Sequence, residues 1–573
     1  MTFCGIMSKF APLFFKYTKD DRLMRTSLNK YIENAIKQNW NELALTDFNG
    51  NSFQYADIAR KIEKLHILLG EAGIKPGDKI ALCGKNCAQW AVAFLGSVTY
   101  GAVPVPLLHE FKADNLHYLV SHSDSKLMFV DPLIWENLDP AEMEGLTGAL
   151  SLDDYSLLLS RSQQLTEARA HLNEMFGRRY PERFTASDVH YPETKPDDLA
   201  LINYTSGSMG FSKGVMVPYR AIESNLQFAL DNIPFFNRTD AMISMLPLAH
   251  MFGLVIEMLH PFVRGCHVYF LTRVPSPKVI LDAFNKVHPK LIITVPLVIE
   301  KIIKKRVFPV LEKPLMRLLL HLPFVDSKLL AKVNDKLYAS FGGNLRELIV
   351  GGAAFNRDVA QFLHRIHFPV TEGYGMTECA PLISYVRWQD SRIGSCGRVV
   401  DRMEVRVDSP DPQNVPGELW VRGDNVMLGY YKNEKATAEV MRDGWMNTGD
   451  LATIDADGFI YLRGRSKNMI LGPSGQNIYP EEIEQQINNL PYVGESLVVD
   501  DDSHRLKALV YPDFESAKAD GVDLGGLGQL IEQEVKGLNK DLPGYSQIAA
   551  VKILDEEFEK TPKRSIKRYL YQH

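Results

Sequence analysis

The chain has 573 residues, a formal net charge of -6 and 45% apolar residues. This length can supply several hydrophobic cores, and the composition is that of an ordinary globular protein. The small negative charge gives no reason to expect nucleic acid as a partner. The six cysteines are scattered, and no second pair accompanies Cys83 and Cys87, which argues against a zinc site and against a disulfide framework.

The N-terminal segment Met1–Tyr17 is mildly apolar and carries Lys9 and Lys16. It lacks an uninterrupted apolar stretch followed by a small-residue cleavage site, so no signal peptide is predicted. No run in the chain reaches the roughly 18 apolar residues of a membrane-spanning helix. We expect a cytoplasmic protein whose N-terminal segment either packs on the protein or contacts a membrane surface peripherally.

Helix and strand patterns alternate along most of the chain. Ile58, Ile62, Leu65 and Leu69 recur at helical spacing, and Lys79–Cys83 is predicted to be a strand. Short apolar runs between helices favour largely parallel sheets that are covered on both faces. These runs include His267–Leu271, Leu291–Val295 and Leu345–Val350, and the apolar stretch Leu199–Tyr204 is predicted separately to be a short buried strand.

Three further segments complete the organisation. The polar stretch 151–194 predicts an inserted helical segment or a linker. The leucine-rich segment Leu315–Leu322 is interpreted as core, because helical apolar stripes are usually buried; an interfacial patch is the alternative. A domain boundary is expected at Gly464–Asn468, where a β-rich stretch ends and a helix start follows at Tyr479-Pro-Glu-Glu.

The most informative run is Tyr-Thr-Ser-Gly-Ser-Met-Gly-Phe-Ser-Lys-Gly-Val, at Tyr204–Val215. Glycines let backbone N–H groups approach an anion, hydroxyls donate to phosphate oxygens, and a lysine supplies a positive charge. The run therefore predicts a phosphate-binding loop, with a flexible surface loop as the alternative. It is not the common nucleotide P-loop, because Lys213 precedes its glycine.

Further motifs follow in a fixed order: Leu246-Pro-Leu-Ala-His-Met-Phe-Gly253, Gly351-Gly-Ala-Ala-Phe355, Tyr374-Gly-Met-Thr-Glu378, Gly417–Gly423, Trp445-Met-Asn-Thr-Gly-Asp450 and Arg465. Taken singly, each has a structural explanation, such as a turn cap, a core aromatic or a buried histidine. Together they resemble the adenylate-forming superfamily of acyl-CoA synthetases, peptide-synthetase adenylation domains and luciferases, over residues 29–568. The run 295–303 and the stretch to Gly343 look most like long-chain fatty acid–CoA ligases.

The resemblance implies a fold and a domain division. The fold class is α/β, with a large N-terminal domain of stacked, mostly parallel sheets with helices plus a β-rich subdomain. A small mobile C-terminal α+β domain follows. We expect the large acyl- and ATP-binding domain at residues 1–465 and the small lid domain at residues 466–573, with a hinge near Lys467.

The resemblance also implies a role for each matching residue. The ATP-binding residues implied are Thr205, Ser206, Gly207, Ser208, Gly210, Lys213, Gly352, Ala353, Tyr374, Thr377, Asp450 and Arg465. The magnesium ligands implied are Thr205 and Glu378, and magnesium prefers such oxygen donors. The acyl site is implied at His250, Gly351 and Gly375, and the CoA tunnel at Gly475.

The activity implied is ATP-dependent activation of a carboxylic acid, expected to be a fatty acid, to an acyl-AMP. Pyrophosphate is released, and CoA then forms a thioester. Mg²⁺ offsets charge as the carboxylate approaches the α-phosphate. Two alternatives stay open: transfer to an acyl carrier protein instead of CoA, and a catalytically weak nucleotide-binding homologue with a regulatory role.

The C-terminal run Thr561–Arg568 departs from the family pattern. Aligned by its threonine and its last arginine, it places Ser565 where the family has a catalytic lysine. We hypothesise that Lys567, which borders an apolar residue, or Lys563 supplies the missing cation. A solvated basic tail is the alternative interpretation. The sequence leaves the acyl chain length and the oligomeric state open.

Overall fold

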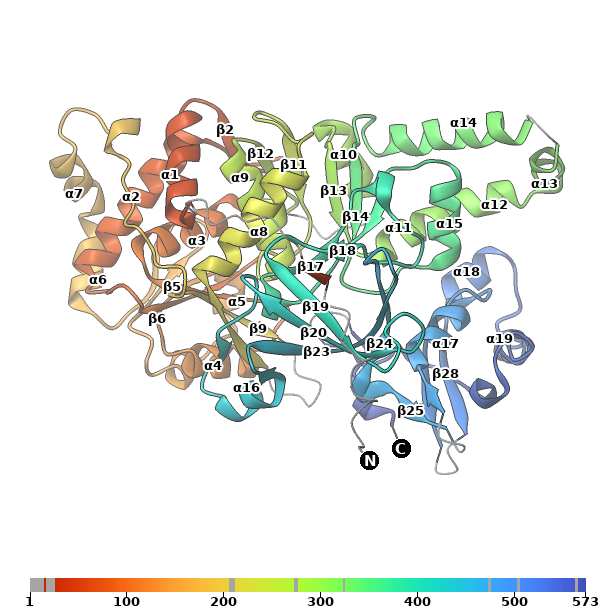
Figure 1. Cartoon of the computed structure of the whole chain (residues 1–573). Helices are drawn as coiled ribbons and strands as arrows, with labels where there is room; N and C mark the ends of the chain where they lie inside the picture. Colours follow the sequence, from red (N-terminus) through yellow and green to blue (C-terminus); the bar gives the residue numbers. More distant parts are fainter. Residues whose placement is uncertain are drawn as a thin grey trace, which may run out of the picture.

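The computed structural model describes residues 15–16, 26–205, 212–272, 277–322, 325–472, 476–501, 505–561 and 565–572. Figure 1 shows a broad body of sheets and helices, with the C-terminal elements gathered at one end. Within the described residues, no helix has both the length and the apolar character needed to cross a membrane. Of the N-terminal segment, only β1 (Phe15–Lys16) is described, and it pairs with β19 (Met403–Asp408).

The first parallel sheet has the strand order β5-β4-β6-β7-β8, in which only β8 runs antiparallel to its neighbour. The strands are β4 (Lys79–Cys83), β5 (Val103–Leu107), β6 (Ser125–Val130), β7 (Gly148–Ser151) and β8 (Leu157–Ser160). The associated helices are α2 (Tyr55–Glu71), α3 (Ala88–Tyr100), α4 (Ala113–His122), α5 (Pro132–Trp135), α6 (Gln163–Ala170) and α7 (Leu172–Arg179). The polar stretch 151–194 therefore contains one strand, β8, and two short helices, α6 and α7.

Two smaller sheets continue the parallel pattern. The sheet β11-β12-β2-β3 contains β2 (Leu43–Asp47), β3 (Ser52–Gln54), β11 (Ala241–Ser244) and β12 (His267–Phe270). The sheet β13-β14-β15 is fully parallel and contains β13 (Leu291–Thr294), β14 (Glu347–Val350) and β15 (Val370–Glu372). Their helices include α1 (Leu28–Gln38), α8 (Tyr219–Asn232), α9 (His260–Arg264), α10 (Pro277–Val287), α11 (Pro296–Ile302), α14 (Val325–Ser340) and α15 (Arg357–Arg365).

Antiparallel strands form the remaining sheets of the large domain. One sheet joins β9 (Leu199–Thr205), β10 (Lys213–Pro218) and β21 (Gly429–Tyr430). Another joins β16 (Tyr374–Gly375), β17 (Leu382–Tyr385) and β18 (Arg398–Val399). The β-rich sheet contains β1, β19, β20 (Gly417–Gly423), β22 (Met441–Arg442), β23 (Trp445–Ile454) and β24 (Ile460–Arg465), and α16 (Glu434–Val440) precedes β22.

The C-terminal elements pack around a hydrophobic cluster of their own, built from residues 470–548. The strands are β25 (Ile470–Leu471), β26 (Asn477–Ile478), β27 (Val493–Asp500), β28 (Leu506–Pro512) and β29 (Ile548–Ile553). The helices are α17 (Pro480–Ile487), α18 (Phe514–Ala519) and α19 (Leu527–Leu538). The predicted α/β class, with parallel sheets, a β-rich subdomain and a C-terminal α+β domain, is confirmed.

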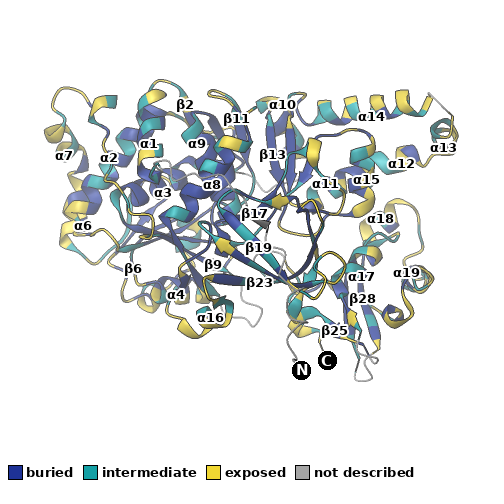
Figure 2. Ribbon diagram, viewed as in Figure 1, coloured by how far each residue is buried: buried dark blue, intermediate teal, exposed yellow. Residues whose placement is uncertain are grey.

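Burial explains why the predicted strands form where they do. Figure 2 shows that the strands of the body are mostly buried, with exposed residues on the helices around them. One expectation is wrong: the segment Leu315–Leu322 is not core. Its helix, α13 (Pro314–Leu320), leaves Leu315 67% and Leu318 62% exposed. No sheet among the described residues covers the apolar side of this helix.

Candidate active site

The phosphate loop expected from the sequence lies between two paired strands. β9 ends at Thr205 and β10 begins at Lys213, and these two residues face each other across the antiparallel pair. The expected loop members Ser206, Gly207, Ser208 and Gly210 lie outside the described residues. The two ends therefore place a hydroxyl and an ammonium group at the mouth of the loop.

Lys213 and Glu378 both contact Tyr430, the first at its ring and the second at its hydroxyl. The Nζ atom of Lys213 lies 4.7 Å from the ring centroid, a distance suited to a cation–π contact. The phenol O–H donates to Oε1 of Glu378 at 2.9 Å. Burial, reinforced by Glu378, raises the pKa of Tyr430 above its ordinary value, which keeps the phenol a proton donor. β21 carries this tyrosine to the site by pairing with β10.

Asp450 binds two partners, one on each carboxylate oxygen. The O–H of Tyr374 donates to Oδ2 at 2.5 Å, and Nε of Arg465 lies 2.7 Å from Oδ1. Asp450 and Arg465 are register partners on β23 and β24, so the hairpin itself places the ion pair. Burial raises the pKa of Asp450, and Arg465 opposes that rise. Burial, followed by the charge of Asp450, raises the pKa of Tyr374 well above its ordinary value.

The two groups of side chains lie close enough to interact electrostatically. The pKa of Arg465 is raised, first by Asp450 and further by Tyr374 and Glu378. Glu378 and Asp450 are both buried, with 9% and 6% of their surfaces exposed. Lys213 and Glu378 are joined by their contacts with Tyr430, and Glu378 lies four residues after Tyr374, which contacts Asp450, so the run Tyr374–Glu378 connects the two groups.

The Asn-Thr-Gly-Asp run that ends in Asp450 is a sharp irregularity in β23. Oδ1 of Asn447 accepts from the N–H of Gly449 at 2.8 Å, and the Thr448 hydroxyl donates to the carbonyl of Leu419 at 2.8 Å. The same hydroxyl accepts from the N–H of Asp450 at 3.1 Å. Gly449 has φ +72°, a conformation that favours glycine. The amide of Asn447, the hydroxyl of Thr448 and the conformation of Gly449 together fix the backbone that carries Asp450.

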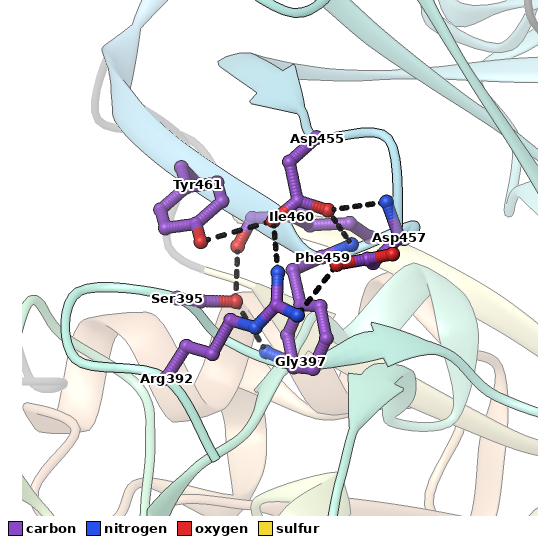
Figure 3. Close-up of polar contacts among 8 residues, drawn as sticks. All are labelled: Arg392, Ser395, Gly397, Asp455, Asp457, Phe459, Ile460 and Tyr461. Carbon is purple, nitrogen blue, oxygen red and sulfur yellow. Dashed lines mark hydrogen bonds and ion pairs between the residues drawn. The ribbon is translucent and has the colours of Figure 1, made fainter. Parts of the chain in front are cut away.

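The far end of the β23–β24 hairpin is clamped to the segment 392–397, which follows β17. Figure 3 shows the guanidinium of Arg392 between two carboxylates of the hairpin turn, those of Asp455 and Asp457, at 2.7 and 2.6 Å. The guanidinium carbon of Arg392 also lies 4.0 Å from the ring centroid of Phe459. The Ser395 hydroxyl donates to the carbonyl of Ile460 at 3.0 Å. Since β17 pairs with the strand of Tyr374, the clamp ties together the two elements that meet at Asp450.

The glycine-rich turn after β14 lies beside an apolar cavity. A Cβ on Gly351 would lie 3.1 Å from the carbonyl oxygen of Gly373 and 3.4 Å from the ring of Phe252. Phe252 also lines a cavity of about 10 Å³ with Phe228, Ala229, Ile233, Ile256, Ile349, Leu382 and Tyr385. Gly351 is buried at the edge of this apolar region, whereas Gly352 and Ala353 are exposed.

The run Tyr374–Glu378 holds its shape through a close backbone contact. A Cβ on Gly375 would lie only 2.1 Å from the carbonyl oxygen of Pro381, so no larger residue fits there. The N–H of Met376 donates to the same carbonyl at 2.8 Å. Thr377 begins a 3-10 turn, η5 (Thr377–Cys379), and is half-buried.

His250 lies on a loop that is tied to the phosphate-loop strand. Its N–H donates to the carbonyl of Pro247 at 2.9 Å, and the side-chain amide of Asn203 on β9 donates to the carbonyl of Ala249 at 2.8 Å. The loop leads into a π-helix, η3 (Gly253–Leu259). Glu257 of that helix is fully buried and accepts from the N–H groups of Met245 and Leu246, both at 2.9 Å. These contacts fix the loop beside β9.

The C-terminal cations lie within the small domain. Lys567 forms an ion pair with Glu559 at 3.0 Å, and Ser565 is exposed. Arg568, which follows Lys567, anchors the tail to α17, because its Nη2 atom lies 2.7 Å from both carboxylate oxygens of Glu484. Lys563 and Gly475 lie outside the described residues. The structure therefore does not bring Lys567 to the Asp450 cluster in this arrangement.

The small domain contacts the large domain through α17 and through the residues after it. The expected hinge residue Lys467 lies in a single 3-10 turn, η7 (Ser466–Asn468), between β24 and β25. The side-chain amide of Gln485 donates to the carbonyl of Phe355 at 2.7 Å, and Asn489 donates to Asp358 at 3.2 Å. Lys304 donates to the carbonyl of Asn488 at 3.3 Å. The contact thus lies directly after the glycine-rich turn.

Three site residues were not found by sequence reasoning: Tyr430, Asn203 and Glu257. Tyr430 follows a glycine on a two-residue strand and carries no periodic signal. Asn203 and Glu257 lie inside buried apolar runs, where a polar residue is the only indication. A buried polar residue within a strand or helix next to a motif was the signal available.

No group of three or more His, Cys, Asp or Glu side chains that could hold a metal ion occurs among the residues described by the structure. The oxygen groups that the resemblance implies as magnesium ligands are the carboxylate of Glu378, which is buried, and the hydroxyl of Thr205 at the end of β9. Magnesium binds through one or two protein oxygens together with substrate phosphates and water, so this donor set fits a nucleotide-bound magnesium ion.

The chain matches two family descriptions. Residues 32–431 match the family described as AMP-binding enzyme, and residues 467–572 match the AMP-binding enzyme C-terminal domain. Among curated proteins, it is 27% identical over 557 residues to the long-chain-fatty-acid–CoA ligase FadD15 of Mycobacterium bovis, covering 90% of this chain and 89% of that protein. It is 28% identical over 519 residues to a feruloyl-CoA synthase of Amycolatopsis, covering 88% and 91%.

Solved structures share the fold. ATP-bound MatB from Rhodopseudomonas palustris superimposes with a TM-score of 0.75 at 24% identity, covering 96% of this chain and 98% of that one. O-succinylbenzoate CoA synthetase from Bacillus subtilis, in complex with ATP and magnesium ion, gives a TM-score of 0.72 at 20% identity, covering 95% and 99%.

Proposed function

Because the chain belongs to the AMP-binding enzyme family, we propose that it is an AMP-forming fatty acid–CoA ligase. In the first step, a carboxylate oxygen of the acid bonds to the α-phosphorus of ATP, and the bond to the β-phosphate breaks to release pyrophosphate. In the second step, the sulfur of CoA bonds to the acyl carbon. AMP leaves with the former carboxylate oxygen, and the thiol proton passes to solvent. The connection of Lys213, Glu378 and Asp450 in one site carries this proposal.

Each side chain of the site has a chemical task in this proposal. Lys213 supplies positive charge to the phosphates at the mouth of the loop. Asp450 accepts from the ribose hydroxyls, because a carboxylate has about four lone-pair sites and two are already occupied. The hydrogen bond to Asp450 fixes the ring of Tyr374, which leaves its face for stacking on adenine.

Magnesium belongs to this proposal as the companion of ATP. Glu378 and Thr205 would hold it, and it would offset the charge that accumulates as two anions approach. Tyr430 keeps one oxygen of Glu378 engaged, and the second oxygen is left for the ion. The carboxylate is buried, so its orientation does not depend on solvent.

A fatty acid is proposed as the acid on two grounds. The cavity beside Gly351 is lined by apolar side chains, and it lies between the helix of Phe228 and the sheet of Ile349. Long-chain-fatty-acid–CoA ligases are among the similar curated proteins. At about 10 Å³ the cavity is too small for an alkyl chain, so its lining side chains would have to move apart to admit one.

A second candidate function is nucleotide binding with weak catalysis. Ser565 stands where the related enzymes carry a lysine, and Lys567 pairs with Glu559. If neither Lys567 nor Lys563 reaches the α-phosphate, the site lacks one cation that would lower the barrier to adenylation. The protein would then bind ATP and act as a regulatory partner.

Pyrophosphate release separates these functions. The purified protein is assayed with ATP, Mg²⁺ and straight-chain acids of increasing length, with and without CoA or a phosphopantetheinyl carrier protein. Release that rises with chain length and yields acyl-CoA supports the ligase, whereas thioester formed only on the carrier identifies the carrier as acceptor. ATP binding without release over the whole panel excludes both ligase reactions and leaves the second candidate.

A matched pair of variants connects the activity to the site. Glu378→Gln keeps the shape of the side chain but loses the negative charge, so release should fall by about 100-fold. Glu434→Gln makes the same change on the exposed start of α16 and should leave the rate unchanged.

A further inference from the structure

The helices between β13 and β14 expose an unusual amount of apolar surface. Five of the 20 large apolar side chains exposed among the described residues fall within residues 310–325, namely Val310, Leu315, Leu318, Leu322 and Val325. Leu315 and Leu318 are spaced three residues apart, which places them on one side of α13, and the exposed Leu322 lies in the turn that follows the helix. Leucines that are more than 60% exposed in a cluster need a partner surface.

The same segment is basic in an otherwise acidic chain. Residues 301–340 contain nine Lys and Arg against three Asp and Glu, although the whole chain has a net charge of -6. Lys328, Lys332 and Lys336 are exposed and follow one side of α14 at four-residue spacing. None of the three has an ion-pair partner within the part of the chain that the structure describes. Asp335 lies at the edge of this stripe and reduces its charge without cancelling it.

The exposed leucines and lysines stand at the outer end of the molecule. Figure 1 shows α12 (Phe308–Leu311), α13 and α14 projecting from the body, with α13 at the tip. α13 packs against α12 and α14. An open groove of about 390 Å³ continues the apolar surface and is lined by Phe308, Leu311, Glu312, Leu320, His321 and Arg365. The arm formed by residues 308–340 therefore combines an apolar tip, a neighbouring groove and a basic flank.

We propose that this arm docks the protein on an anionic membrane surface. The leucines of α13 enter the boundary between headgroups and acyl chains, and the lysines of α14 bind the negative headgroups. An apolar side chain gains free energy on leaving water, and each lysine near an anionic bilayer adds attraction, so the two features act together. A protein partner would explain the leucines, but the row of three exposed lysines on the neighbouring helix is complementary to a negative surface.

Vesicle binding tests this proposal without nucleotide or acid, so its outcome does not depend on the proposed ligase activity. The full chain is sedimented with vesicles of phosphatidylcholine alone or with about one third phosphatidylglycerol. We expect strong binding only to the anionic vesicles, weakening as salt is raised. In Leu315→Ser/Leu318→Ser and in Lys328→Glu/Lys332→Glu/Lys336→Glu, the partition coefficient should fall by at least about tenfold.

The matched control is Leu43→Ser/Leu133→Ser, which removes two leucines that are 44% and 70% exposed on other elements. It should sediment like the unmodified chain, and thermal unfolding should show that all variants stay folded. Equal binding of the arm variants and the control would overturn the proposal. So would failure of the unmodified chain to bind anionic vesicles. Concentration-dependent dimerisation that the leucine variant abolishes, without vesicle binding, would assign the tip to a second copy instead.

Discussion

The charges around Asp450 and those around Lys567 are held in different ways. Asp450 is 6% exposed, and both of its oxygens are engaged by Tyr374 and Arg465. Lys567 meets Glu559 in an ion pair whose side chains are 30% and 65% exposed. Such an exposed pair contributes about 0–1 kcal/mol, so it opens readily. Asp450 is buried, whereas its partner Arg465 is 55% exposed, so the carboxylate rather than the whole pair is shielded from water. The large domain thus keeps its charges in a fixed arrangement, and the tail keeps a cation that can leave its partner.

The largest effect is expected for Asp450→Ala. The change removes the acceptor for ribose and leaves the guanidinium of Arg465 and the hydroxyl of Tyr374 without their partner. We expect pyrophosphate release to fall by about 10³-fold. The unfolding free energy should fall by about 1–3 kcal/mol, because the buried Tyr374 hydroxyl loses its partner while the half-exposed Arg465 can be solvated. Steady-state kinetics and chemical denaturation measure the two effects. A variant with native rate and stability would show that the buried pair serves neither purpose.

The double variant Lys563→Ala/Lys567→Ala tests whether the tail supplies the missing cation. Loss of that cation should lower acyl-adenylate formation by about 100-fold, while the exposed Lys567 pair costs the fold less than about 1 kcal/mol. Lys560→Ala is the control, since Lys560 is a tail lysine that pairs with Glu495 and Glu557. The single variants Lys563→Ala and Lys567→Ala then show which lysine supplies the cation. An undiminished rate in the double variant eliminates the hypothesis.

A smaller effect is expected for Tyr430→Phe. The ring that contacts Lys213 is kept, but the hydrogen bond to Glu378 is lost. Hydrogen bonds to charged groups contribute about 1.5–3 kcal/mol, so we expect about a tenfold lower rate and a higher Mg²⁺ requirement. Titration of the rate with Mg²⁺ measures both changes. Tyr431→Phe, at the neighbouring residue that donates to Asp124 instead, should leave the Mg²⁺ dependence unchanged.

The smallest effect is expected for Arg392→Ala at the hairpin clamp. Its ion pairs with Asp455 and Asp457 and its stacking on Phe459 lie at the exposed surface, where such contacts are screened by water. We expect a small loss of stability and less than about a threefold change in rate. A loss of rate as large as that of Asp450→Ala would mean that the clamp sets the position of Asp450 rather than merely supporting it.

Local patterns were enough to predict most of the fold. The apolar runs before the phosphate loop and at Lys79–Cys83 became the buried strands β9 and β4; only β4 is parallel to its neighbours, whereas β9 pairs antiparallel with β10. Ile58, Ile62 and Leu65, which recur at helical spacing, lie in α2 and are buried there. The segment Leu315–Leu322 misled the interpretation, because periodicity reveals that a stripe exists but not whether a partner covers it.

The candidate site could be predicted only where motifs carry it. Asp450 and Arg465 were each identified by resemblance, and their direct pairing depends on the register of β23 and β24. Tyr430 could not be found, because its contact with Glu378 depends on how two sheets pack together. The placement of Lys567 with Glu559 likewise depends on tail geometry that a basic run does not specify.

The residue that caps the start of α15 also contacts the small domain, at Asn489 after α17. Oδ1 of Asn356 caps α15 by accepting from the N–H groups of Asp358 and Val359, and its amide nitrogen faces Asn489 of the small domain. Rotation of the small domain would exchange the Asn489 contact for water, yet the cap would stay in place. Such exchanges change the free energy little. If the small domain rotates, as the resemblance implies, the start of α15 would therefore remain a fixed support.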